Sequence, residues 1–238
     1  MPQRRNLFAE SPRMTRGEIV FGWIYLVFYL FLTPLLIQLV LELARIRYDV
    51  YELNLIYFYV NFIAVVLFCR KFLMESFRQT RVLPLLHGIL TGYGINWLLA
   101  LAVTGISMSI SDYVNPADAA TTEMILGNKS LMTVCAVFLG PLVEEILVRG
   151  LIFAPLARRK RWLGYLVSTV VFSALHLLGY IGTVPVDELL LSLLDYVPSS
   201  IALAYAYERG GTIWSPIALH MLINAMSVMA IGAMGTLT

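Results

Sequence analysis

The stretch GPLVEEILVRG, residues 140–150, places three charged side chains inside an apolar run. On insertion scales, a residue such as Glu144, Glu145 or Arg149 costs about 2.5–3.5 kcal/mol at the centre of a membrane-spanning helix. Charged residues in such helices therefore face the protein interior and have partners. The composition of the whole chain indicates whether this stretch lies in a membrane.

The chain has 238 residues, of which 59% are hydrophobic and only 13% charged, whereas soluble domains carry about 25% charged residues. A helix of about 20 residues crosses the hydrocarbon core. We therefore expect an all-α polytopic membrane protein with about seven transmembrane helices. The expected spans are residues 19–44, 53–69, 85–110, 130–156, 162–180, 188–207 and 212–232. The second is short, and the sixth is interrupted by Asp195 and Pro198.

The distribution of basic residues indicates the orientation of these spans. With the N-terminus in the cytoplasm, thirteen of the 17 Lys and Arg residues fall on inside segments and three on outside segments. This bias follows the positive-inside rule. It predicts a cytoplasmic N-terminus and a C-terminus outside, and we expect no nucleic-acid partner. The 111–128 segment contains acids but no Lys or Arg, and is predicted to be a solvated outer loop. Cys69 and Cys135 lie in apolar runs and are expected to be buried and unpaired.

The two glutamates of the 140–150 stretch differ in their predicted partners. Glu145 and Arg149 are four residues apart, on one helical face, and can form an ion pair. Glu144 lies about 140° around the helix from Arg149 and cannot easily share that partner. We therefore interpret the pair as structural and Glu144 as the free carboxyl group. Pro141 removes a backbone donor and is expected to kink the helix nearby.

Polar residues also interrupt two later spans. FSALH, residues 172–176, contains His176, and HMLIN, residues 220–224, contains His220 and Asn224 on one helical face. At 1.5 Å per residue, Glu144, His176 and His220 lie about 22, 21 and 12 Å from the ends of their spans. We expect them to meet in one buried polar pocket. Taken singly, each histidine or amide also fits helix–helix hydrogen bonding.

Two further polar residues have a less defined role. His87, at the inner end of the third span, has no comparable partner and is interpreted as structural. Asp195 either lines the pocket or marks a water-exposed helix break beside Pro198.

Three motifs in order resemble those of a known family. EEILVR fits EExxxR, FSALH fits FxxxH and HMLIN fits HxxxN, and YERGGTIWSPIALHMLIN is also similar to the family's last conserved stretch. The sequence thus resembles the CAAX-protease and bacteriocin-processing group of intramembrane proteases, also called the ABI family, over about residues 130–230. Residues 1–129 match no motif. We expect about three N-terminal membrane helices in 1–129, and a protease-like core in the last four helices, 130–238.

The resemblance implies hydrolysis of a peptide bond in a membrane-associated or lipidated peptide or protein. By motif position, Glu144 is the general base, and His176 helps to activate a water. His220 and Asn224 stabilise the oxyanion. The residues that correspond to supporting positions are Glu145, Arg149 and Phe172.

Three alternatives remain open. Glu144, His176 and His220 also form a plausible zinc-ligand set, although a zinc-bound Glu144 is lost as a base, so no cofactor is the favoured reading. A non-catalytic immunity or regulatory scaffold of the same fold would bind peptides without cutting them. A transporter also buries ionisable residues, but it commonly has inverted repeats, and none is visible in this sequence.

Overall fold

The computed structural model describes residues 7–110 and 113–234. Within these residues every regular element is a helix, and there is no strand. Seven segments are long and apolar enough to cross a membrane, namely Arg16–Leu43, Val50–Phe68, Val82–Ser109, Lys129–Arg159, Arg161–Tyr180, Val186–Gly210 and Trp214–Ala233. The expected all-α, multi-pass membrane fold is therefore confirmed, with the span ends moved by a few residues.

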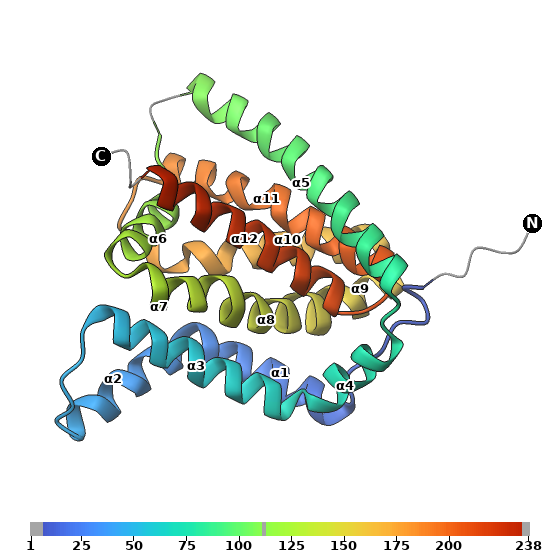
Figure 1. Ribbon diagram of the computed structural model, residues 1–238, viewed down its shortest axis with the longest axis horizontal. Helices are drawn as coiled ribbons and strands as arrows, with labels where there is room; N and C mark the ends of the chain where they lie inside the picture. Colours follow the sequence, from blue (N-terminus) through green and yellow to red (C-terminus); the bar gives the residue numbers. More distant parts are fainter. Residues whose placement is uncertain (1–6, 111–112, 235–238) are drawn as a thin grey trace, which may run out of the picture.

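The first two spans form an antiparallel pair on one side of the molecule (Figure 1). The first contains α1 (Arg16–Val27), a π-helical turn (Phe28–Leu32) and α2 (Thr33–Leu43). The second is α3 (Val50–Phe68), and α4 (Arg70–Gln79) follows it. Both α1 and α3 begin with a capping box, which satisfies backbone donors of the first turn. The short second span is therefore a complete helix with a defined start.

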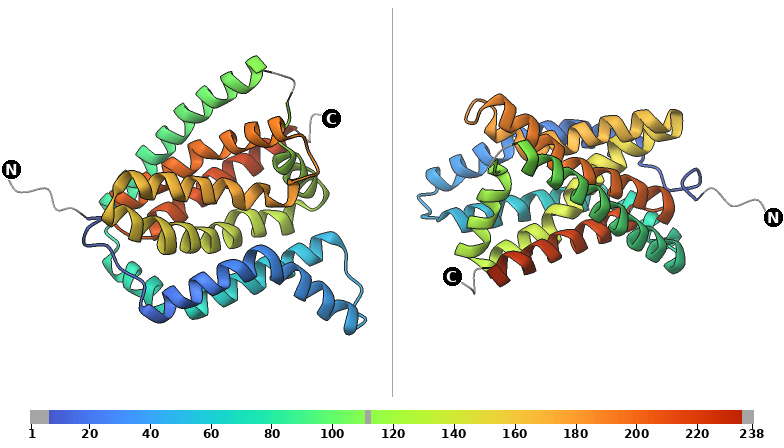
Figure 2. Two further views of the ribbon diagram at one scale, coloured as in Figure 1. Left: turned by 180° about the vertical axis from the view of Figure 1, so that it is seen from behind. Right: turned by 90° about the horizontal axis from the view of Figure 1, so that it is seen from above.

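The fourth span packs against this pair and against the later helices, which makes it the most buried of the seven (Figure 2). Its helix changes type repeatedly. The segments are α7 (Lys129–Thr133), a π-helical stretch (Val134–Leu139), α8 (Gly140–Glu145), a second π-helical stretch (Ile146–Phe153) and α9 (Ala154–Arg159). Pro141 lies in the first turn of α8. A π-helical stretch therefore lies on either side of α8, a form common at functional sites.

The remaining spans surround the fourth on its other side. They are α5 (Val82–Ile110), α10 (Arg161–Leu177) with a 3₁₀ turn (Leu178–Tyr180), α11 (Val186–Gly210) and α12 (Trp214–Met234). Pro198 lies inside α11 without ending it. In Figure 1, α5 crosses the bundle obliquely and packs on α11 and α12. Gly92 permits this approach, because a Cβ there would lie 2.6 Å from a Leu219 methyl carbon.

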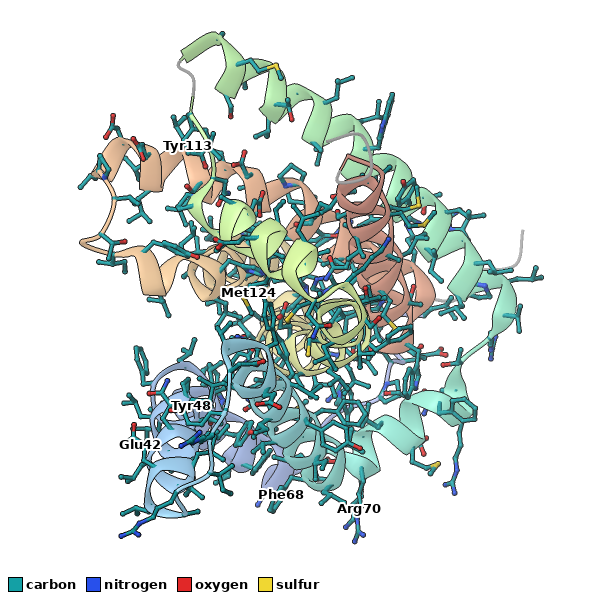
Figure 3. All side chains as sticks on the ribbon, turned by 60° about the vertical axis from the view of Figure 1, so that its left-hand side comes forward. Glu42, Tyr48, Phe68, Arg70, Tyr113 and Met124 are labelled. Atoms are coloured by element: carbon teal, nitrogen blue, oxygen red, sulfur yellow. The ribbon has the colours of Figure 1, made fainter. Side chains whose placement is uncertain are left out.

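The bundle has two ends, each named after the short helix that lies there. We call the end with connections 44–49, 113–128 and 181–185 the α6 end. The opposite end, with residues 7–15, 69–81, 160 and 211–213, is the α4 end. At the α6 end, Pro116–Gly127 forms α6, which begins at the Asn115 cap and buries Ala117 and Ile125. Figure 3 marks Tyr113 before α6 and Met124 within it.

The prediction of a solvated loop at 111–128 is wrong for residues 116–127, because they form a helix that packs against α7 and α12. Residues 111–112 lie outside the described residues. The prediction for the two cysteines is confirmed, since both are buried and unpaired.

Candidate active site

Three spans bring one carboxylate and two imidazoles together. Glu144 on α8 places Oε2 3.9 Å from Nε2 of His176 on α10 and 3.9 Å from Nε2 of His220 on α12. These distances exceed a direct hydrogen bond and suit a single bridging water. The Glu144 side chain is 14% exposed. The residues predicted to meet from different spans therefore do lie together.

Glu144 has room because of the residue one helical turn before it. A Cβ at Gly140 would lie 3.4 Å from Glu144 Oε1 and 3.1 Å from a ring carbon of Phe58. Any larger side chain at this position would crowd the carboxylate or the neighbouring α3. The glycine thus keeps the wall of the site open beside Glu144.

Glu145 has two partners, of which the sequence predicted one. Its Oε1 accepts a hydrogen bond from Arg149 Nη1 at 3.0 Å, as expected from the four-residue spacing. The same oxygen lies 2.9 Å from Nδ1 of His220. This second contact was missed, because it depends on the register between α8 and α12, for which the sequence carries no signal.

Arg149 connects the site to α10 and α11. Its Nη2 donates to the backbone carbonyl and to Oγ of Ser200, both at 3.2 Å. Its Cζ lies 4.3 Å from the centroid of the Phe172 ring, within the range of a cation–π interaction. The Phe172 ring also contacts both His176 and His220, with centroids 4.8 and 5.6 Å apart. Phe172 and Arg149 therefore support the two imidazoles on the side of the site that faces the α4 end.

The hydrogen bonds define which nitrogens face Glu144. His176 Nδ1 lies 2.9 Å from the Phe172 carbonyl oxygen, which only accepts hydrogen bonds. His220 Nδ1 faces the Glu145 carboxylate, which also accepts. We therefore assign a proton to Nδ1 in both rings. Both Nε2 atoms then face Glu144.

Asn224 lines the cavity beside this cluster and has a hydrogen-bond partner of its own. Its Nδ2 donates to the carbonyl of Ala136 at 2.8 Å, across the contact between α12 and the first π-helical stretch. Asn224 lines the same cavity as Glu144, His176 and His220. Since a side-chain amide has two N–H groups, one remains available toward the cavity.

A second polar cluster, which sequence analysis did not identify as part of the site, lies on the α6 side of His176. The Tyr196 ring stacks on the imidazole of His176 at a centroid distance of 4.3 Å and an interplanar angle of 22°. Its hydroxyl donates to Asp118 on α6 at 2.9 Å. The only signal in the sequence was the acidic composition of 111–128. Asp118 therefore connects α6 to the histidine through Tyr196.

Asp195, for which two interpretations were open, lines the cavity. Its Oδ2 accepts hydrogen bonds from the hydroxyl of Tyr113 and from Nδ2 of Asn115, both at 3.0 Å. The helix continues past Pro198, so the interpretation as a helix break is wrong.

Asp118 is also on the cavity wall. Withdrawal from bulk water raises the pKa of Asp118, and the nearby Asp195 carboxylate raises it further, whereas the Tyr196 hydroxyl and His176 lower it.

The cavity lined by Glu144, both histidines, Asn224 and the two aspartates has a volume of about 680 Å³. Ten of its polar lining residues are Asn54, Asn96, Asp118, Thr121, Glu144, His176, Asp195, Ser199, His220 and Asn224. In the described part of the chain, no group of three or more His, Cys, Asp or Glu side chains is arranged to hold a metal ion. The cavity is large enough for several residues of an extended peptide.

The fold and this cavity define a multi-pass membrane protein with a buried polar site between its helices. Residues 126–226 match the family described as "Type II CAAX prenyl endopeptidase Rce1-like". The resemblance read from the three motifs is thereby confirmed for this part of the chain.

A curated relative indicates the same class of protein. The chain is 30% identical over 148 residues to a Bacillus subtilis (strain 168) protein named "Putative membrane peptidase YdiL". The match covers 58% of this chain and 56% of that protein, or about half its length. No solved structure matches the chain.

Proposed function

We propose that the protein is an intramembrane endopeptidase that hydrolyses a peptide bond in a membrane-associated or lipidated peptide or protein. The single observation that carries the proposal is the position of Glu144 Oε2, 3.9 Å from Nε2 of both His176 and His220. The family match over residues 126–226 supports the same chemistry. We assign the catalytic core to residues 130–238 and a supporting role to 1–129.

In the proposed reaction, Glu144 and His176 activate a water that lies between them. Glu144 takes one proton from this water, and the resulting hydroxide forms a bond to the carbonyl carbon of the substrate. The carbonyl oxygen becomes an oxyanion. When the C–N bond breaks, the proton held by Glu144 goes to the leaving amine. Each atom and proton of the water is then accounted for in the two products.

The oxyanion requires donors on the far side of the carbonyl. Asn224 offers the amide N–H that Ala136 does not occupy. His220 donates through Nε2 when its ring carries both protons. The Glu145 carboxylate at Nδ1 balances the charge of that form and fixes the orientation of the ring. Glu145 and Arg149 thus act on the reaction through His220, without contact with the substrate.

The proposed mechanism uses no metal. A zinc ion on Glu144, His176 and His220 is the alternative mechanism, and it takes Glu144 away from proton transfer. Purified active protein should retain cleavage after treatment with a chelator. Loss of activity on chelation and its return with zinc would favour the metal mechanism.

The proposal is tested by comparing membrane peptides in cells that express the wild-type protein with those from cells that express Glu144→Gln. Peptides that depend on wild-type protein should disappear with Glu144→Gln and with His220→Ala. Two matched controls should cleave as the wild type does. Glu42→Gln alters an exposed glutamate on the peripheral α2 (Figure 3), and His87→Ala an exposed histidine on α5. Full cleavage by both site variants, at normal expression, would refute the assignment. Unchanged peptides in all cells would favour the non-catalytic scaffold.

A further inference from the structure

The cavity extends from the Glu144 cluster toward one end of the bundle only. Beyond the catalytic residues, it is lined by the first turns of α3 with Asn54, by the middle of α5 with Asn96, and by α12 as far as Ile231. Much of α6 also lines it. Among the described residues that line the cavity, none belongs to the connections at the α4 end.

The α4 end of the bundle is closed by packed side chains below the site. Arg149 and Phe153 are fully buried, and so is Tyr207. Phe8 from the N-terminal segment covers this layer, with its ring 5.7 Å from both Phe153 and Tyr207. Arg158 fastens the same segment by donating to the backbone and hydroxyl of Ser11. A peptide therefore has no open path to Glu144 from the α4 end.

The α6 end, in contrast, has lining residues that are exposed. They include Thr121 on α6 and Ser227 on α12. At this end α6 is attached to α11 by side-chain hydrogen bonds, from Tyr196 to Asp118 and from Asn115 to Asp195. The way into the cavity is therefore beside α6, which lies over its mouth.

Charge relates this end to the two sides of the membrane. The connections at the α4 end carry most of the Lys and Arg residues, whereas the α6 end has only Arg45 and Arg47 in its connections and Lys129 at the start of α7. The positive-inside rule then orients the α6 end away from the cytoplasm.

We propose that the substrate reaches Glu144 from the extracytoplasmic side, past α6. This inference rests on the proposed function and narrows its substrate class. The substrate is a membrane-anchored polypeptide whose cleaved segment lies at or just within the outer membrane surface. A lipidated C-terminus displayed in the cytoplasm would meet the closed α4 end.

Cysteine labelling tests the access route without any need for cleavage. In a background with Cys69→Ala and Cys135→Ala, single cysteines are introduced by Thr121→Cys at the mouth, Ser199→Cys inside the cavity and Gln79→Cys at the α4 end. A small charged methanethiosulfonate that does not cross membranes is applied to intact cells and to inside-out vesicles. We expect Thr121→Cys and Ser199→Cys to react in intact cells, and Gln79→Cys only in inside-out vesicles.

Three results would overturn the proposal. These are reaction of Ser199→Cys only in inside-out vesicles, reaction from neither side, and an exchange of the Thr121→Cys and Gln79→Cys patterns. The labelling is repeated with Glu144→Gln, so an absence of cleavage leaves this result readable and counts against the proposed function alone. Where a cleaved peptide has been found, coupling a bulky maleimide to Thr121→Cys from outside should abolish its release. The same reagent on Gln79→Cys in inside-out vesicles should leave release unchanged.

Discussion

Glu144→Gln and Glu145→Gln should change the free energy of unfolding by very different amounts, although the two residues are adjacent. Glu145 is fully buried, and its Oε1 serves both Arg149 and His220. Glutamine can keep these two hydrogen bonds through its own oxygen, but it removes the charge that compensates Arg149. In the wild type, Glu145 Oε2 is buried and has no hydrogen-bond partner. Glutamine places an NH₂ group at that position, where it lacks an acceptor. Removing one partner of a buried ion pair costs about 3–5 kcal/mol.

Glu144→Gln alters a side chain that lines the cavity and has no direct hydrogen bond to either histidine. Its effect on the free energy of unfolding should stay within about 0.5 kcal/mol, as for substitutions that break no partner. Its effect on cleavage should be complete, because Glu144 is the proposed base.

Equilibrium unfolding by SDS in mixed micelles, followed by tryptophan fluorescence and circular dichroism, measures both free energies. The double variant Glu145→Gln/Arg149→Met removes both charges of the pair, and we expect it to recover much of the stability lost in Glu145→Gln. Equal destabilisation by Glu144→Gln and Glu145→Gln would refute the reasoning. An unchanged free energy of unfolding for Glu145→Gln would refute it as well.

Three more predictions follow from the surroundings of the site. Tyr196→Leu removes the ring stacked on His176 and should lower kcat/KM by up to about tenfold. Tyr196→Phe keeps the ring and should retain most activity. Equal losses of kcat/KM for the two variants in steady-state assays would exclude the ring stacking as the cause. The pKa of Asp118 is raised in the folded state, so its protonated form favours folding. The stability that Asp118 gives α6 is therefore complete below the ordinary aspartate pKa. It is lost as the pH rises through the higher pKa of the folded state. After correction for the intrinsic rise of amide exchange with pH, hydrogen exchange of α6 should therefore lose protection over that range in the wild type and not in Asp118→Asn. Burial, with a contribution from the charge of Glu18, raises the pKa of the Cys69 thiol to about 12, so at neutral pH Cys69 should react with maleimide only after unfolding in SDS.

The sequence was sufficient for the number and class of the spans. Length and apolarity alone identify a membrane helix, because every backbone polar group in lipid must be paired within the helix. The π-helical stretches on either side of α8 were not predictable, since they depend on how the fourth span fits between its neighbours. The loop predicted at 111–128 was an avoidable error. Asn115 followed by Pro116 and by Asp118 is a sequence signature of a helix start, and the structure contains that helix.

The site was predictable only where residues on one helix define a face. The spacing of Glu145 and Arg149 predicted their ion pair, which the structure contains. Contacts between helices, such as that of His220 with Glu145, depend on the rotation and register of two separate helices. The approach of Tyr196 to His176 has the same origin, because Tyr196 lies outside all three motifs. A motif therefore identifies the residues that meet, and packing decides which atoms of those residues touch.

The different surroundings of the two adjacent glutamates also separate the proposed enzyme from a scaffold. Successive residues of an α-helix point about 100° apart, so one register of α8 directs Glu145 into a closed ion-paired cluster and Glu144 into the cavity. A scaffold needs only the first of these, because Arg149, Ser200 and Phe172 already join the helices around Glu145. A carboxylate at membrane depth without a direct partner is costly and contributes nothing to that packing. On the scaffold hypothesis, Glu144→Gln should therefore preserve every measurable property of the protein or stabilise it, whereas on the enzyme hypothesis it preserves stability and abolishes cleavage.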